Sequence, residues 1–289
     1  MNDDVRAIGI DVGATNVKGV SVNAAGRILA RGSRAIASSS VLEVVRELLN
    51  ELGRNTQSVG IAAPGIASPD GRSIWWMQGR LGEVQGVEWA SPLQRDQPVP
   101  VINDAHAALL GEVWVGAAKG CHNVILLTLG TGVGGATMVD GHLLRGHLGR
   151  AGHLGHICLD PDGPLDIVNT PGSLEDAIGE CSLSRRSNGR FTSTGELLAA
   201  TDEEAKAIWQ TSIRALACGL ASLVNVLDPE LILLAGGMPA AGEKLFDPLR
   251  AEMEKFEWRP HGRAVRIVPA AAGEYAGAIG AAFHAMNQP

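Results

Sequence analysis

Short apolar runs separated by glycine turns open the chain. Residues 7–13 form one run and residues 17–23 a second, in which apolar side chains alternate with small or polar ones. Alternation over so few residues is typical of β-strands, and the short Ala-Thr-Asn connection between the runs predicts a hairpin. Residues 24–34 turn into a third strand, so the opening segment predicts a β-meander.

Helical spacing appears next. Apolar side chains recur at helical intervals over residues 41–52, which predicts an amphipathic helix. The apolar segments 58–65 and 98–104 predict two buried strands, and the second runs directly into another helical pattern. Strands and helices therefore alternate through the first part of the chain, as in an α/β domain.

The strand–turn–strand pattern begins again in the second half. Residues 123–144 repeat a strand, a glycine turn and a strand, and a helix is predicted over 203–227. Residues 230–243 give a strand, a glycine turn and the start of a helix, and small residues dominate a last helical pattern. We expect mixed sheets flanked by helices. The expected division is a first domain 1–116, a second domain 117–272, and a helix at 273–289 that packs back on the first.

Composition and charge exclude several classes of partner. The 289 residues carry a formal net charge of −7 without a cluster of Lys and Arg, which argues against nucleic acid, since phosphate neutralisation needs such clusters. The four cysteines are scattered without a CxxC pair, which favours a reducing compartment over a disulfide framework. The start lacks the basic residues of a secretory signal, and no apolar run reaches membrane-spanning length. We expect a cytoplasmic protein with no membrane partner.

The first candidate for chemistry is the glycine turn within Asp11–Gly19. Such a turn between two strands exposes backbone N–H groups to a bound anion. A carboxylate beside bound phosphates can hold Mg²⁺ directly or through water, a role that suits Asp11. The motif predicts a phosphate-binding turn, with an ordinary hairpin as the alternative. Its candidate cofactor-binding residues are Asp11, Gly13, Thr15, Asn16 and Lys18.

A second glycine turn lies in Leu129–Ala136. Gly130 and Gly132 allow close approach of the backbone to a phosphate, and Thr131 adds a hydroxyl. No Lys-Ser or Lys-Thr follows, so this is not a Walker P-loop. A strand rather than a helix comes next, which excludes a Rossmann fingerprint. The segment predicts a second phosphate turn.

A third glycine site ends the apolar run of the later strand. Gly236 and Gly237 stand between this strand and the next helix, where an adenosine could lie across the backbone. A plain strand-to-helix turn is the alternative. The ordered set of three sites predicts two phosphate turns and one adenosine site.

Asn103 and Asp104 stand at the end of a predicted strand, just before a helix. Asn and Asp are preferred helix caps, so capping alone can explain them. The functional interpretation is that Asp104 accepts the proton of an attacking hydroxyl, because phosphoryl transfer uses a carboxylate to orient the nucleophile. The two roles are compatible.

Several of these motifs resemble the ROK family, which comprises repressors, uncharacterised frames and sugar kinases within the hexokinase, Hsp70 and actin superfamily. The segments IGIDVGATNVKG, AAPG, INDAHAALLGE, LTLGTGVGGA and LILLAGG occur in the family's order and approximate spacing, over nearly the whole chain. The resemblance implies a two-domain actin-like ATPase fold of the ribonuclease H-like type. It also implies ATP and Mg²⁺ as cofactors and a homodimer. Repressors of the family carry a DNA-binding domain before the first strand, and only a few residues precede it here, so we expect a kinase.

By the same resemblance, Asn103 and Asp104 match the family's Asn-Asp pair, with Asp104 as general base. His156 matches the histidine of the family's Glu-x-Gly-His motif. The sugar is expected to contact a set of six residues: Gly65, Asn103, Asp104, His153, His156 and Glu175.

The chain departs from the family pattern in two features. His153 stands where the family has the glutamate of Glu-x-Gly-His, and an imidazole offers one donor and one acceptor where a carboxylate offers only acceptors. We therefore expect altered sugar preference. Asp166, Val168 and Ser173 stand where many members have cysteines that hold a structural zinc with a histidine, and valine cannot ligate metal, so we expect no structural zinc.

The resulting hypothesis is ATP-dependent phosphorylation of a hexose or hexose derivative at O6. Two alternatives stay open. One is a non-catalytic, sugar-sensing regulator of the same family. The other is a sugar kinase that uses polyphosphate, for which Arg185 and Arg186 form the one obvious local basic cluster.

Overall fold

The computed structural model describes residues 4–36, 40–53, 56, 58–78 and 81–288. The chain folds into two compact units, each with its own five-stranded sheet. Unit 1 contains Met1–Gly120, Arg145–Ala151 and Ala270–Pro289, and unit 2 contains Cys121–Leu144 and Gly152–Pro269.

The sheet of unit 1 has the order β3-β2-β1-β4-β7. Its strands are β1 (Ala7–Val12), β2 (Asn16–Val22), β3 (Ile28–Ala35), β4 (Ser58–Ala63) and β7 (Val101–Asn103). The first three pair antiparallel as a meander, whereas β4 and β7 continue from β1 in parallel. A separate pair is formed by β5 (Ile66–Ala67) and β6 (Ile74–Trp76).

The parallel strands of unit 1 bring polar residues to one edge of the sheet. Asp11 is paired with Ala62 near the end of β4, and Ala63 is paired with Asn103 at the end of β7. Because these strands share a direction, Asp11 and Asn103 both lie at the carboxyl edge. In open α/β sheets this is the edge at which ligands bind.

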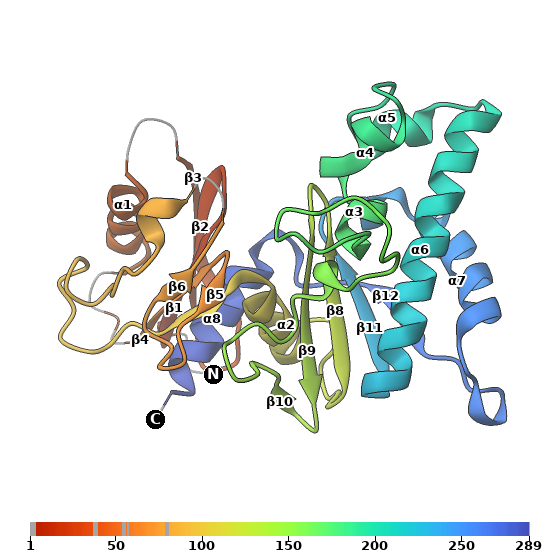
Figure 1. Ribbon diagram of the computed structural model, residues 1–289. Helices are drawn as coiled ribbons and strands as arrows, with labels where there is room; N and C mark the ends of the chain where they lie inside the picture. The colour runs from red at the N-terminus through yellow and green to blue at the C-terminus, as the bar shows by residue number, and fades with distance from the viewer. Residues whose placement is uncertain (1–3, 37–39, 54–55, 57, 79–80, 289) are drawn as a thin grey trace. The chain divides into compact units, whose positions relative to one another are not determined.

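Helix α8 (Ala276–Met286) packs against this sheet with its backbone close to the backbone of the strands. It is the blue helix beside β1 in Figure 1. A Cβ atom at Gly9 would lie 1.8 Å from the carbonyl oxygen of Ala278, and one at Gly60 would lie 2.2 Å from that of Ala281. No side chain fits at such distances, so these strand positions require glycine. The other elements of unit 1 are α1 (Val41–Gly53), α2 (Asp104–Val115), η1 (Gly82–Val84) and η6 (Gly273–Tyr275).

The sheet of unit 2 has the order β10-β9-β8-β11-β12 and also begins with an antiparallel hairpin followed by parallel strands. Its strands are β8 (Val124–Leu129), β9 (Val133–Val139), β10 (His142–Leu143), β11 (Leu231–Ala235) and β12 (Arg266–Pro269). Helices α6 (Glu203–Leu227) and α7 (Glu243–Phe256) run side by side in Figure 1. The short helices are α3 (Leu174–Ile178), α4 (Leu183–Arg186), α5 (Thr194–Ala199), η2 (Leu154–His156), η3 (Glu180–Ser182), η4 (Met238–Ala241) and η5 (Pro260–Gly262).

Helix α6 has the length and apolar composition of a membrane-crossing helix. Among the described residues, no other helix has both. Its apolar side chains belong to the buried core of unit 2, where Ile213, Leu216 and Leu220 pack with residues of β8 and β11. This is the composition of a core helix. The predicted class, an α/β protein of mixed sheets flanked by helices, is confirmed.

Candidate active site

The predicted site residues fall into two groups, one on each unit. In unit 1, the turn between β1 and β2 is closed by the N–H of Gly13, which donates to the carbonyl oxygen of Asn16 at 3.0 Å. Ala14, Thr15 and Asn16 are exposed at the tip of this turn. An anion-binding turn requires an exposed tip of this kind, and anion binding here stays a prediction.

Asp11 lies near two other charged side chains of unit 1. Burial, the largest cause, and the nearby charge of Asp104 together raise the pKa of Asp11 to about 7, with Lys18 acting in the opposite direction. The amine of Lys18 is bonded to Glu274, with 3.0 Å between Nζ and Oε2. A Cβ atom at Gly277, in the first turn of α8, would lie 2.5 Å from Oδ2 of Asp11, so glycine is needed there.

The pair of carboxylates on Asp11 and Asp104 fits a divalent cation. The pKa of Asp11 is raised first by burial and then by repulsion from the like charge of Asp104, and both effects disfavour its charged form. A bound Mg²⁺ takes oxygen ligands and would stabilise both carboxylates. In unit 1, Asp11 is thus the residue best suited to hold the ion.

Asn103 is the N-cap of α2. Its Oδ1 accepts from the amides of Ala105 at 3.0 Å and His106 at 3.1 Å, and its Nδ2 donates to the carbonyl oxygen of Gly65 at 3.0 Å. Gly65 has φ +100°, and a Cβ atom there would lie 2.6 Å from the carbonyl oxygen of Trp76. The capping role therefore falls to Asn103. Asp104 is the first residue of the helix, and its Oδ1 accepts from Ala105 at 2.8 Å.

In unit 2, residues that follow α3 donate hydrogen bonds to the turn between β8 and β9. The carbonyl oxygen of Gly130 accepts from the amide of Glu180 at 3.1 Å, and that of Thr131 accepts from Cys181 at 2.8 Å. Thr131 is exposed. The amide of Gly130 donates to the carbonyl oxygen of Gly132 at 3.1 Å, so an anion would be bound by other amides of the turn and by the hydroxyl of Thr131.

Glu175 braces the same turn, a contact that sequence reasoning missed. Its Oε2 accepts from the amide of Val133 at 2.9 Å. A Cβ atom at Gly132 would lie 2.5 Å from this oxygen. Glu175 stands in the first turn of α3, capped by Ser173, so the helix carries the carboxylate to the glycine turn. The 42 positions between Glu175 and Val133 leave no local pattern to predict this contact.

The neighbouring glycines of this turn give a matched pair for a stability test. Gly132→Ala forces the carboxylate of Glu175 to move and weakens its bond to Val133, so the free energy of unfolding should fall by about 1 kcal/mol. Gly130→Ala should change it far less, because a Cβ atom there meets nothing within 4 Å. Denaturant unfolding of the two variants compares them. Equal loss in both would mean that Glu175 does not brace the turn.

The two predicted histidines lie in and beside η2. His153 is the N-cap of η2 and is half-buried. His156 ends η2, and its Nδ1 lies 2.8 Å from Oδ2 of Asp166. A Cβ atom at Gly155 would lie 1.9 Å from the carbonyl oxygen of Val133, so η2 sits directly on β9. The sequence analysis named Asp166 only as a residue at a position where relatives have a zinc-binding cysteine. In the structure it is the hydrogen-bond partner of His156.

The third glycine site contacts the second within unit 2. Gly236 has φ +91°, and a Cβ atom there would lie 2.3 Å from the carbonyl oxygen of Leu129, the residue before the turn. Gly237 is exposed, and a Cβ atom there meets nothing within 4 Å. The structure brings Gly236 to the β8–β9 turn, whereas the binding of phosphate by this turn and of adenosine by the two glycines stays a prediction.

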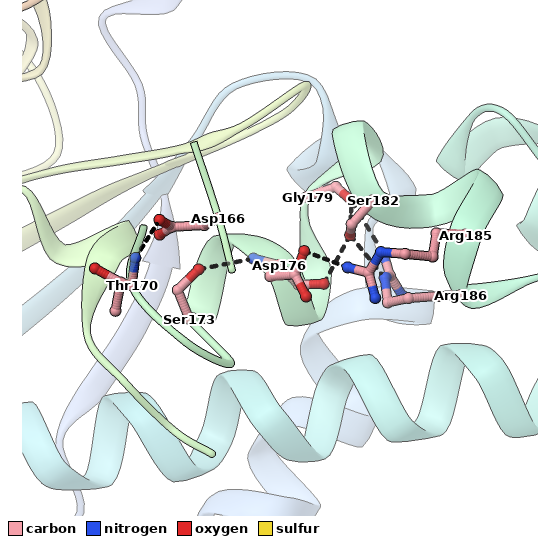
Figure 2. A network of polar contacts seen from close by, with 8 residues as sticks. All are labelled: Asp166, Thr170, Ser173, Asp176, Gly179, Ser182, Arg185 and Arg186. Atoms are coloured by element: carbon pink, nitrogen blue, oxygen red, sulfur yellow. Dashed lines mark hydrogen bonds and ion pairs between the residues drawn. The ribbon is translucent and has the colours of Figure 1, made fainter. Parts of the chain in front are cut away.

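The basic pair that polyphosphate would need is engaged inside unit 2 (Figure 2). Arg185 is paired with Asp176. Arg186 donates to the hydroxyls of Ser182 at 2.9 Å and Ser212 at 2.6 Å, and to the carbonyl oxygen of Gly179 at 3.1 Å. These contacts give the two arginines a structural role and argue against a phosphate-binding track at this place.

Comparison with known proteins places the chain in a family. Residues 7–288 match the model of the ROK family. The chain is 28% identical to a glucokinase of Thermotoga maritima, covering 96% of both chains, and 30% identical to an N-acetylmannosamine kinase of Vibrio cholerae, covering 96% of this chain and 99% of the relative. Its structure resembles the ROK family glucokinase of Streptomyces griseus in complex with glucose and AMPPNP. That likeness has a TM-score of 0.81 and 27% identity, and it covers 98% of this chain and 99% of the other. The chain belongs to the ROK family.

Proposed function

We propose that this protein is an ATP-dependent sugar kinase that phosphorylates a hexose or hexose derivative at O6. The observation that carries the proposal is the pair of carboxylates, Asp11 and Asp104, beside an exposed glycine turn in unit 1. The similarity to glucokinases and to an N-acetylmannosamine kinase supports a sugar as acceptor. The similarity to a structure that holds AMPPNP supports a nucleotide as donor.

In this proposal Asp104 is the general base. It accepts the proton of the sugar hydroxyl while the hydroxyl oxygen forms a bond to the γ-phosphorus and the bond between that phosphorus and ADP breaks. Mg²⁺, held by Asp11, would neutralise charge on the phosphates. In each unit by itself, the glycine turn would bind phosphate oxygens through backbone amides other than those of Gly13 and Gly130, which donate within their own turns.

The remaining predicted sugar contacts are considered for each unit by itself. Asn103 is already fixed by its bonds to α2 and to Gly65, so its role is to hold the backbone that carries Asp104. His153, His156 and Glu175 supply the remaining hydrogen bonds to the sugar. A site built to hydrogen-bond sugar hydroxyls discriminates strongly against a sugar that leaves those groups unpaired.

The direct test is turnover with a panel of sugars. The purified protein is mixed with ATP and Mg²⁺ and with glucose, mannose, N-acetylmannosamine or N-acetylglucosamine, and both ADP release and the mass of the product are followed. We expect ADP and a monophosphorylated sugar in equal amounts, with turnover lost when the metal is chelated. ATP hydrolysis that is independent of sugar, or sugar binding without turnover, would contradict the proposal and favour a sugar-sensing regulator.

His153→Glu is expected to change the sugar preference. An imidazole can donate one hydrogen bond to a sugar hydroxyl, whereas a carboxylate can only accept, so hydroxyls of different configuration are favoured. The ratio of kcat/KM between two sugars of the panel should change by about tenfold or more, the effect of one hydrogen bond to a charged group. His142→Glu, at an exposed histidine of β10, is the matched control. Unchanged ratios would refute a sugar contact for His153.

A further inference from the structure

The hydrogen bond between His156 and Asp166 joins an accessible ring to a buried carboxylate. The side chain of His156 is 23% exposed and that of Asp166 only 2% exposed, with 2.8 Å between Nδ1 and Oδ2. A carboxylate that accepts this bond requires the proton on Nδ1. In the neutral ring, the other nitrogen, Nε2, then carries a lone pair.

Asp166 is held in a fixed orientation by its own loop. Its Oδ1 accepts from the amide of Thr170 at 2.8 Å, a contact drawn in Figure 2, and from that of Val168 at 2.9 Å. Burial alone would raise the pKa of Asp166, but hydrogen bonds from Thr170, His156, the hydroxyl of Ser173 and Val168 together lower it below its usual value. The carboxylate is thus a fixed acceptor aimed at His156.

The residues around Asp166 do not fit the zinc of other family members. The three positions where cysteines would stand carry Asp166, Val168 and Ser173. Val168 offers no ligand atom, and Ser173 is fully buried, with its Oγ capping α3 by accepting from the amide of Asp176. Zinc bound to Nδ1 would leave the proton of the ring on Nε2, whereas the bond to Asp166 leaves Nε2 without one. The two arrangements therefore present opposite hydrogen-bonding properties at Nε2.

We propose that Asp166 is a positioning residue that replaces the zinc: it holds His156 in the tautomer with Nδ1 protonated, so that Nε2 accepts a hydrogen bond from a sugar hydroxyl. This rests on the proposed sugar kinase function. The consequence is specificity for a hydroxyl that can donate to Nε2 and accept from another group. His156 contacts the sugar, and Asp166 acts through it.

A divalent cation is the rival explanation for this cluster. Ligand atoms of His156, Asp166 and Glu175 all lie within 4.8 Å of one another, which is a possible metal site. Each carboxylate is, however, already bonded to backbone amides, Asp166 to those of its own loop and Glu175 to that of Val133. Asp166 is thus bonded through both of its oxygens without an ion, so the hydrogen-bonded pair with His156 is favoured.

Asp166→Asn tests the proposal most directly. It keeps the shape of the side chain and reverses the direction of its hydrogen bond with His156. The amide oxygen can keep the bonds from Val168 and Thr170, which turns the NH₂ group towards Nδ1 of His156. Nδ1 must then accept, and the proton of the ring moves to Nε2. We expect the sugar KM to rise by about tenfold or more, with a smaller change in kcat, while Asp162→Asn, at an exposed aspartate of the same segment, leaves both unchanged.

The decisive measurement is ¹⁵N NMR of the histidine side chains at pH 8, with the signal of His156 assigned from a His156→Gln variant. The wild-type ring should show a proton on Nδ1, and the Asp166→Asn ring a proton on Nε2. A proton on Nε2 in the wild type overturns the proposal, as does one equivalent of bound zinc by elemental analysis. The wild-type spectrum decides even if Asp166→Asn fails to fold. The spectrum does not need turnover, so a failure of the kinase function itself would appear separately, in the sugar panel.

Discussion

Asp104→Asn is expected to lower kcat by a factor of about 10²–10⁴, the contribution typical of a general base. Asn has the size of Asp and keeps a hydrogen-bonding oxygen, so binding of the sugar should stay within a few fold of the wild type. Titration calorimetry with the best sugar of the panel and coupled measurement of ADP release give the two quantities. A large loss in kcat with little change in sugar affinity is the expected signature.

The loss of turnover should not come from unfolding. The neutral side chain gives up an interaction of about 0.3–1 kcal/mol with the N-terminus of α2, but it also removes the charge that raises the pKa of Asp11. The two effects oppose each other, so thermal stability should change little. Asp96→Asn, at an exposed aspartate of unit 1, is the matched control. An Asp104→Asn variant within tenfold of wild-type kcat would refute the assignment of the base.

Most of the fold could be predicted from periodicity. The alternating runs at the start became β1 and β2, and the helical spacing over residues 41–52 and 203–227 became α1 and α6 with nearly the same bounds. The segment Arg145–Ala151, which belongs to unit 1, has no such signal. It is held by contacts to distant residues, with Arg145 donating to the carbonyl oxygen of Ser68 at 3.2 Å. Contacts of this kind depend on the tertiary structure and leave no local pattern.

The site was less accessible to sequence reasoning than the fold. Motifs and family resemblance pointed to the glycine turns and to Asp104. They did not show that Glu175 bonds to Val133, or that Asp166 faces His156. A side-chain pairing between residues 10 or 42 positions apart is fixed by how the loops pack, and no spacing rule describes it. The departures at the zinc positions were visible in the sequence, but the pairing of Asp166 with His156 was not.

Glu112 is a structural carboxylate that the sequence did not single out. It stands in α2, is 0% exposed, and both of its oxygens accept from backbone amides of unit 1. Ala117 donates to Oε2 at 2.8 Å, and Ala271 and Ala272 donate to Oε1 at 2.9 and 2.6 Å. These amides lie on the segments that leave and re-enter unit 1, after α2 and before α8. One side chain therefore holds two of the four segments at which the chain passes between the units.

Glu112→Gln is expected to destabilise unit 1 strongly. The amide group of glutamine replaces one acceptor oxygen by a donor, which then faces the N–H of Ala117 or those of Ala271 and Ala272. A hydrogen bond to a charged group contributes about 1.5–3 kcal/mol, and a buried donor left without an acceptor costs about 1–3 kcal/mol. The free energy of unfolding should fall by about 3 kcal/mol or more by the same reasoning. For a domain of this size, that corresponds to a drop in Tm of about 6–12 °C.

Scanning calorimetry of Glu112→Gln beside Glu88→Gln, at an exposed glutamate of unit 1, measures this loss. Hydrogen exchange adds the location, because the amides of Ala271 and Ala272 should exchange faster in Glu112→Gln while the amides of the β8–β9 hairpin in unit 2 keep their rates. If Tm stayed within about 2 °C of the control, below the effect of one such hydrogen bond, the carboxylate would not be holding these two segments. An unchanged Tm with faster exchange at these alanines would instead mean that the contact is local and that other packing, such as that of α8 on Gly9 and Gly60, holds the unit together.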